Sequence, residues 1–371
     1  MDLAFSDEQE QLRDSVRRFL ADKSPISEVR RLMETPDGYD RDVWALMAGH
    51  LGLLGLTIPE RYGGTGSGPA ELTIVLEEMG AALLCAPYFS TVALAANAIM
   101  LAGDDEAKKE LLPLISSGEV IAALAIAEDD GRWDLAGVRL EARPASGGYA
   151  LTGHKNYVLD GHVADLIVVV ARTGDSIGFF TVGAAAPGLQ RTRLPTLDMT
   201  RTQARLEFNE TPARLIGDPR VAPAALARTL DLAAIALAAE MVGGAQRCLD
   251  MSVSYAKTRY QFGRPIGSFQ AIKHKCADML LNIETARTAA YYAGWAAAAG
   301  SDELPAVASL AKAHCSEAFF QVAAENIQIH GGIGFTWEHD AHLYFKRATS
   351  SQLLFGDPAY HREQLVQRIG I

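Results

Sequence analysis

Two short segments of this sequence combine arginine, glycine and aromatic residues at spacings that suit a phosphate-bearing ligand. The first runs from Arg259 to Pro265 with the sequence RYQFGRP and is followed by Phe269-Gln270. Two guanidinium groups beside a Gly-Pro turn can hold a pyrophosphate, because their planar, permanently charged forks match its oxygens. An exposed turn between two helices, with solvated charges, would have the same composition. These residues alone leave the two interpretations evenly balanced.

The second segment, 328–335 with the sequence QIHGGIGF, places two adjacent glycines after a helical stretch. Gly331 and Gly332 would expose backbone N–H groups and let a phosphate or sugar approach closely. A glycine cap that ends a helix would look the same. His330 precedes the glycines, but no second histidine lies at helical ligand spacing, so the sequence predicts no metal site. The strand-Gly-x-Gly-x-x-Gly-helix unit of a Rossmann nucleotide site is absent.

Length and composition exclude several classes of protein. A chain of 371 residues is long enough for two or three domains. The 34 Lys+Arg against 45 Asp+Glu, with no basic cluster, predict no nucleic-acid partner. Four cysteines that stand far apart are typical of reduced thiols. No apolar run approaches the roughly 20 residues of a membrane span, and the acidic N-terminus does not look like a targeting peptide. We therefore expect a cytoplasmic protein with no membrane partner.

The hydrophobic period changes twice along the chain and thereby predicts an α+β protein of three domains. Residues 1–118 have a helical period and should form an N-terminal α-helical domain. Short apolar runs separated by turn clusters predict a middle domain over 119–222, built as an antiparallel sheet or β-barrel. From 223 to 371 the helical period returns, and long helices with short connections predict a four-helix bundle. Its helices are expected over 223–258, 268–299, 304–329 and 340–348.

Taken together, these segments resemble the acyl-CoA dehydrogenase family over nearly the whole chain. The resemblance rests on the early segment LGLTIPERYGG at 54–64, on the Arg259–Ile266 segment with Phe269-Gln270, and on Gln328–Phe335. It implies the same three-domain fold, FAD as cofactor and an acyl-CoA thioester as substrate. In this family a carboxylate removes the α-proton and the flavin accepts the β-hydride. The resemblance further implies an acceptor of the electron-transfer flavoprotein type and a homo- or hetero-tetramer.

The resemblance also assigns residues to the cofactor. In the family, the Arg-x-x-Phe-Gly and Gln-x-x-Gly-Gly motifs hold the adenine side of the flavin that belongs to a neighbouring subunit. The residues that would take this role are Arg259, Phe262, Phe269, Gln270, Gln328, His330, Gly331 and Gly332. Tyr157 stands where the family has a tryptophan over the flavin ring. Ala127 and Leu159, however, replace two threonines beside the flavin, which implies weaker binding in the subunit's own site.

The catalytic base is the main departure from the family pattern. The family's commonest base is a glutamate, and counting from Gly331 places that position at Phe355, which cannot take a proton. Asp357 is the nearest carboxylate, although Asp357-Pro358 is also a typical helix start. Some relatives carry the base on the first bundle helix, where this chain has Ala233. The nearest acid there is Glu240, seven residues and about 10 Å further along the helix.

The departures affect the features that serve a subunit's own flavin, whereas the motifs offered to a neighbour's flavin are intact. This asymmetry favours a cofactor-completing subunit paired with a paralogous acyl-CoA dehydrogenase subunit, as in heteromeric actinobacterial enzymes that act on bulky thioesters such as steroid side-chain CoA esters. One alternative is an active homotetramer that uses Asp357 or Glu240 as its base. A second alternative is a catalytically inactive acyl-CoA- or flavin-binding homologue.

Overall fold

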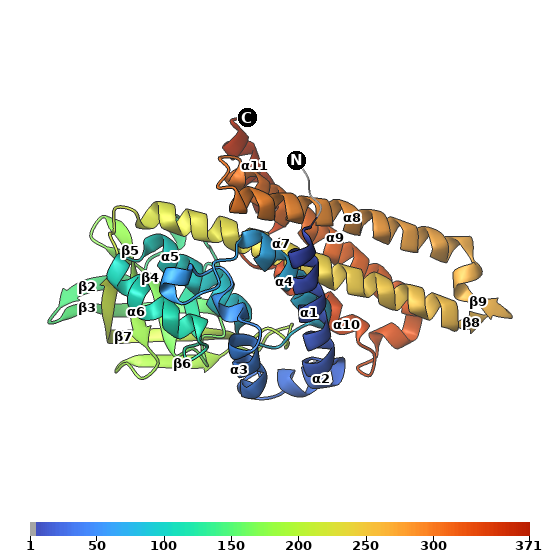
Figure 1. Cartoon of the computed structure of the whole chain (residues 1–371), viewed down its shortest axis with the longest axis horizontal. Helices are drawn as coiled ribbons and strands as arrows, with labels where there is room; N and C mark the ends of the chain where they lie inside the picture. Colours follow the sequence, from blue (N-terminus) through green and yellow to red (C-terminus); the bar gives the residue numbers. More distant parts are fainter. Residues whose placement is uncertain (1–4) are drawn as a thin grey trace. The chain divides into compact units, whose positions relative to one another are not determined.

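The computed structural model describes residues 5–371, in which helices precede and follow a central run of strands (Figure 1). The N-terminal helices are α1 (Asp7–Lys23), α2 (Ile26–Met33), α3 (Arg41–Gly49), α4 (Pro69–Ala82), α5 (Asn97–Ala102) and α6 (Asp105–Ser116). Helix α1 begins at a capping box, because the Ser6 hydroxyl accepts from the Gln9 backbone and the Gln9 side chain bonds the Ser6 backbone. Phe89–Ala96 precedes α5 as a π-helical stretch, a form frequent at functional sites.

The central strands form a closed barrel. They are β1 (Ala122–Ala125), β2 (Glu141–Ala145), β3 (Gly148–Leu159), β4 (Leu166–Thr173), β5 (Ser176–Gly183), β6 (Leu189–Arg193) and β7 (Gln203–Ile216). The order β4-β2-β3-β7-β5 closes on itself because β5 also pairs with β4. Strand β1 pairs with β4 in parallel, because the β2–β3 hairpin lies between them in the sequence and forms the crossover connection. Most other pairings are antiparallel. The predicted antiparallel β-domain is confirmed, with this parallel edge strand as a feature the sequence did not indicate.

The C-terminal part of the chain is helical, as predicted. Its helices are α7 (Ala222–Thr258), α8 (Gln270–Ala298), α9 (Leu304–His330), α10 (Ala341–Leu353) and α11 (Pro358–Ile369). The first three have the predicted bounds within two residues, and α10 is five residues longer at its end. The sequence indicated α11 only by its start at Asp357-Pro358. The three-part fold is confirmed. The boundaries at 118 and 222 stay a prediction.

The chain folds into two compact units whose segments interleave in the sequence. The bundle unit contains the described part of 1–31 together with 69–84 and 234–371, and the barrel unit contains 32–68 and 85–233. In the bundle unit, α4 crosses α7 at backbone contact. A Cβ on Gly80 would lie 2.0 Å from the Glu240 carbonyl oxygen, and one on Gly243 would lie 1.7 Å from that of Glu77. Only glycine fits at these two positions. No helix within residues 5–371 is long and apolar enough to cross a membrane.

Candidate functional site

The Arg259–Pro265 segment is a small β-hairpin that holds an aromatic ring in solvent. Strands β8 (Tyr260–Gln261) and β9 (Arg264–Pro265) pair directly after the end of α7. Phe262 and Gly263 form the turn with φ of +55° and +77°, the two-residue form that suits the twist of a hairpin. The left-handed conformation costs a non-glycine residue roughly 1–2 kcal/mol. Phe262 bears this cost while it is 91% exposed.

The remaining residues of this motif gather around the hairpin. The Phe269 ring lies 6.1 Å from the Phe262 ring, edge to face, and the Arg264 guanidinium stacks on it at 4.1 Å. Gln270 begins α8, and both Gln270 and Arg259 are exposed. The predicted residues of the motif therefore present two aromatic rings and two guanidinium groups on one hairpin and the adjoining helix start.

Gly331 ends helix α9 and confirms the cap interpretation of the glycine pair. Its φ is +64°, and its N–H donates to the carbonyl oxygens of Gln328 and Ile327. A Cβ on Gly331 or Gly332 would meet no atom within 4 Å, so the space in front of both residues is open. The cap role does not exclude ligand binding, because the open backbone is the surface that a phosphate group needs.

His330 links the two motifs within the bundle unit. Its ring packs against the Tyr255 ring at 4.4 Å, and the Tyr255 carbonyl oxygen accepts from the Arg259 N–H. Burial lowers the pKa of His330, whose Nδ1 lies 2.7 Å from the Asn326 carbonyl oxygen. His330 therefore packs against Tyr255, and its predicted role in cofactor binding stays a prediction. Residues 5–371 contain no cluster of histidine, cysteine and carboxylate side chains that could hold a metal ion.

The donor set of the bundle unit fits one end of a dinucleotide. Arg259 and Gln270 are exposed polar groups, Gly331 and Gly332 offer uncovered backbone, and Phe262 offers a ring on which a base can stack. Such a mixture of cation, amide, glycine and aromatic groups is what a nucleotide diphosphate requires.

Tyr157 lies in the barrel unit at a bulge of strand β3. The register between β3 and β7 shifts between Lys155 and Val158, and Tyr157 itself has a φ of +57°. The bulge turns the tyrosine outward, where it is 38% exposed. Ala127 and Leu159, which replace the family's threonines, are buried. The ring is thus displayed at the predicted position, while the two lost hydroxyls are replaced by core methyl groups.

The loop next to Tyr157 is held by a buried ion pair. Glu128 Oε1 accepts from the Lys155 ammonium at 2.8 Å and from the backbone N–H groups of Arg139 and Leu140. Burial raises the pKa of Glu128, but the charge and hydrogen bond of Lys155, together with the backbone N–H groups of Leu140 and Arg139, outweigh it and hold the pKa below its usual value. These contacts hold the backbone of the loop in place, although Ala127 and Leu159 differ from the residues expected beside a flavin.

Phe355 occupies the short segment between α10 and α11. Its side chain is buried, its φ is +62°, and its carbonyl oxygen lies 3.1 Å from His361 Nε2. A buried aromatic residue in the left-handed conformation is a strained arrangement, of the kind that occurs at functional sites. The strained backbone lies at the position that the family resemblance predicts for the base, although the phenylalanine side chain cannot accept a proton.

Asp357 caps helix α11, as its alternative interpretation predicted. Its Oδ1 accepts from the Tyr360 N–H at 2.7 Å, and Pro358 follows at the first helical position. The capping contact engages the carboxylate and does not test its catalytic role, which stays a prediction.

We expect Asp357→Ala to lower the free energy of unfolding by about 0.5–2 kcal/mol, because the first turn of α11 loses its cap. Asp357→Asn should cost far less, since asparagine caps as well as aspartate. Urea unfolding of both variants checks this, with Glu363→Ala on the exposed side of the same helix as the control. An Asp357→Ala loss no larger than that of Glu363→Ala would contradict the capping role.

Glu240 lies buried on α7 and has the partner that a buried carboxylate needs. Its Oε1 accepts from Arg347 Nη1 on α10 at 2.8 Å, and both residues are at most 7% exposed. A charge at this depth is stable only when it is paired. The structure thus assigns Glu240 a role in joining α7 to α10, and a catalytic role for it remains untested.

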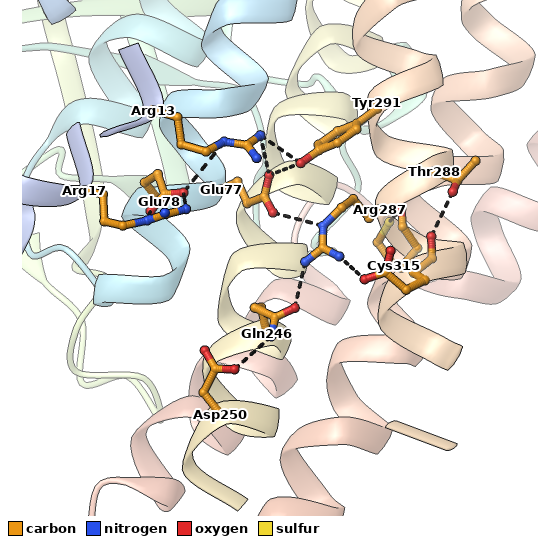
Figure 2. Close-up of polar contacts among 12 residues, drawn as sticks. Arg13, Arg17, Glu77, Glu78, Gln246, Asp250, Arg287, Thr288, Tyr291 and Cys315 are labelled. Atoms are coloured by element: carbon orange, nitrogen blue, oxygen red, sulfur yellow. Dashed lines mark hydrogen bonds and ion pairs between the residues drawn. The ribbon is translucent and has the colours of Figure 1, made fainter. Parts of the chain in front are cut away.

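Sequence reasoning missed a cavity of about 850 Å³ in the bundle unit. Several of its lining side chains form the network of polar contacts drawn in Figure 2. Glu77 Oε2 accepts from the Tyr291 hydroxyl at 2.5 Å and lies 3.5 Å from Arg13 Nη2, while Glu77 Oε1 accepts from Arg287 Nε at 3.2 Å. Glu78 forms a bidentate pair with Arg17. The signal in the sequence was a Glu-Glu pair that interrupts the apolar stretch of α4 after Leu76. Because each carboxylate forms an ion pair with an arginine, we interpret this network as one that holds α1 and α8 against α4.

Comparison with known proteins agrees with these features. Family models match residues 6–119, as the acyl-CoA dehydrogenase N-terminal domain, and 224–370, as its C-terminal domain. The chain is 38% identical to the acyl-CoA dehydrogenase IpdE2 of Mycobacterium tuberculosis over 352 residues, covering 95% of this chain and 94% of the relative.

Two solved heteromeric assemblies are also similar. A chain from a variant of the Tcur3481-Tcur3483 steroid ACAD superimposes with a TM-score of 0.88 and 32% identity, covering 98% of both chains. A chain of the ChsE4-ChsE5 complex of Mycobacterium tuberculosis gives 0.90 and 28% identity, covering 100% of this chain and 99% of the other. The protein therefore belongs to the acyl-CoA dehydrogenase family of FAD-dependent oxidoreductases.

Proposed function

We propose that this chain takes part in the FAD-dependent α,β-oxidation of an acyl-CoA thioester as the cofactor-completing subunit of a hetero-tetramer with a paralogous acyl-CoA dehydrogenase. Its Arg259–Gln270 and Gln328–Gly332 segments contribute to the partner's flavin site. The paralogue supplies the base. An electron-transfer flavoprotein-type acceptor removes the electrons. The four cysteines, none of them in a disulfide within residues 5–371, are consistent with a cytoplasmic setting.

The exposed, strained Phe262 is the observation that carries the proposal. Six non-glycine residues within 5–371 have a left-handed φ, and the three aromatic ones among them are Tyr157, Phe262 and Phe355. By the family resemblance these are the flavin-ring, adenine-side and base positions. Strain persists only where the surrounding structure enforces it. Phe262 combines this backbone strain with 91% exposure, and a molecule that covered the ring would remove its apolar surface from water.

The carboxylates at the candidate base positions support the division of labour between two unlike subunits. Asp357 caps α11 and Glu240 pairs with Arg347, so each carboxylate already has a structural contact. Phe355 has no proton-accepting group. Two of the similar solved structures are named as unlike pairs, Tcur3481-Tcur3483 and ChsE4-ChsE5, and the first is called a steroid ACAD. On this basis we extend the proposal to a bulky, steroid-like acyl group.

The contribution of this chain to the chemistry is then one of binding and orientation. FAD, when bound, supplies the hydride acceptor. Arg259 is placed to hold a phosphate group through its charge, and Gly331 and Gly332 allow that group to approach the backbone. Phe262 offers stacking to the adenine, which excludes water from one of its faces.

Substitution of Phe262 tests the proposal. Phe262→Ala should lower the FAD content of the hetero-tetramer by roughly tenfold at limiting FAD, because stacking of a base on an aromatic ring is worth about 1–3 kcal/mol. Tyr260→Ala is the matched control, since Tyr260 is 61% exposed on the same hairpin but lies outside the left-handed turn. FAD per assembly is measured by absorbance after gel filtration. Equal FAD loss in both variants, or none in either, would contradict the proposal.

A further inference from the structure

A fully buried lysine in the bundle unit lies beneath the segment that contains Phe355. Lys312 on α9 has no exposed surface, and its Nζ donates to three oxygens. These are the Ser316 hydroxyl at 3.0 Å, the Gln352 carbonyl at 3.2 Å and the Gly356 carbonyl at 3.0 Å. An ammonium group has three hydrogens, so each hydrogen has one acceptor.

The two carbonyl acceptors lie on either side of Phe355. Gln352 is in the last turn of α10, where carbonyl groups lack helical partners, and Gly356 follows Phe355. Gly356 has a φ of +109°, and a Cβ there would lie 2.3 Å from the Tyr360 ring. One cation therefore contacts the chain at both ends of this stretch, and only glycine fits at position 356.

The surroundings of the Lys312 amine lower its pKa. The three bonded acceptors are neutral oxygens, and burial lowers the pKa of Lys312 to about 7, against smaller opposing effects of Cys315 and Asp357. His361 on α11 faces the same space, where burial and the Lys312 charge lower its pKa to about 3 and keep it neutral. Arg368 adds a further positive charge near His361.

We propose that Lys312 is the positioning residue of the segment 353–356, which it clamps through the Gln352 and Gly356 carbonyl oxygens so that residue 355 keeps its left-handed backbone. The clamp itself follows from the contacts in this chain. Its importance for acyl-CoA oxidation rests on the proposed function, because only the family resemblance makes position 355 part of the active site.

The clamp has a definite dependence on pH. A neutral amine has two hydrogens for three acceptors, and the Ser316 hydroxyl already donates its own hydrogen to the Lys312 carbonyl at 2.6 Å. Loss of the proton therefore weakens the hold on the segment. Global stability changes in the opposite direction, because the unfolded chain binds more protons than the folded one between about pH 7 and pH 10.5. Lys312 thus makes the whole protein more stable, but this segment looser, as pH rises above 7.

Hydrogen exchange of the full-length chain, followed by mass spectrometry, tests the clamp. At pH 6, Lys312→Met should speed the exchange of amides 354–357 at least about tenfold, because two carbonyl groups lose a charged donor. In the wild type, exchange there, corrected for its intrinsic pH dependence, should rise roughly threefold to tenfold from pH 6 to pH 8. Lys312→Met should show no such rise.

Lys155→Met is the matched control, because Lys155 is the other fully buried lysine named here and lies in the barrel unit. It should leave amides 354–357 unchanged. A flat wild-type profile between pH 6 and pH 8 would overturn the proposal, and this arm needs no variant to fold. Equal acceleration in both lysine variants would overturn it as well. The exchange is measured without added FAD, so a failure of flavin binding would refute the proposed function and leave this result standing.

Discussion

The purified chain alone is expected to oxidise acyl-CoA thioesters about 10²–10⁴-fold more slowly than its assembly with a base-bearing paralogue. This range is what general-base assistance contributes, and the family resemblance predicts the base position at Phe355. Without a positioned carboxylate, nothing in the segment 353–356 removes the α-proton at neutral pH. The rate of flavin reduction by acyl-CoA under anaerobic conditions measures this difference, with both preparations reconstituted with FAD.

Two substitutions distinguish this account from an active homotetramer. Asp357→Asn and Glu240→Gln should leave the residual rate of the lone chain unchanged, because both carboxylates serve structural contacts. A lone chain with rapid turnover that Asp357→Asn abolishes, while FAD stays bound, would assign the base to Asp357. The same outcome with Glu240→Gln would assign it to Glu240.

Glu240→Ala is expected to lower the free energy of unfolding by about 3–5 kcal/mol, because it leaves the Arg347 guanidinium buried without its carboxylate. Urea unfolding at pH 7 measures the loss. The double variant Glu240→Leu with Arg347→Met should recover much of it, since a buried ion pair can be replaced by apolar side chains of similar volume at little cost. If the single and the double variants lose the same free energy of unfolding, the unpaired Arg347 charge is not the cause of the loss, and the account of the ion pair is contradicted.

The hydrophobic period of the sequence was sufficient to predict the main helices and strands. Helices α7, α8 and α9 are long enough for the 3.6-residue hydrophobic period to define them. Two of the short apolar runs in the middle domain, at Val168–Ala171 and Phe179–Val182, lie within β4 and β5. Glycine at 331 was also correctly predicted as a cap, because a left-handed residue after a helix favours glycine.

Other features depend on contacts between segments far apart in the chain and could not be predicted from local pattern. Strand β1 pairs with β4 across more than 40 residues of sequence, so no local period indicates their parallel pairing. Arg347 was not predicted as the partner of Glu240, nor Lys312 as a clamp, because a buried charge is recognised only from what surrounds it. The strain at Phe262 and Phe355 is equally invisible in residue type, since phenylalanine gives no sign of a left-handed backbone.

The FAD content per polypeptide of the chain, purified alone and together with its nearest paralogue, tests the central claim most directly. The account predicts an unlike assembly that binds one FAD per pair of chains and loses it when Phe262 is replaced, and a lone chain that retains little FAD. A lone chain that holds one FAD per polypeptide and reduces it rapidly with acyl-CoA would contradict the account.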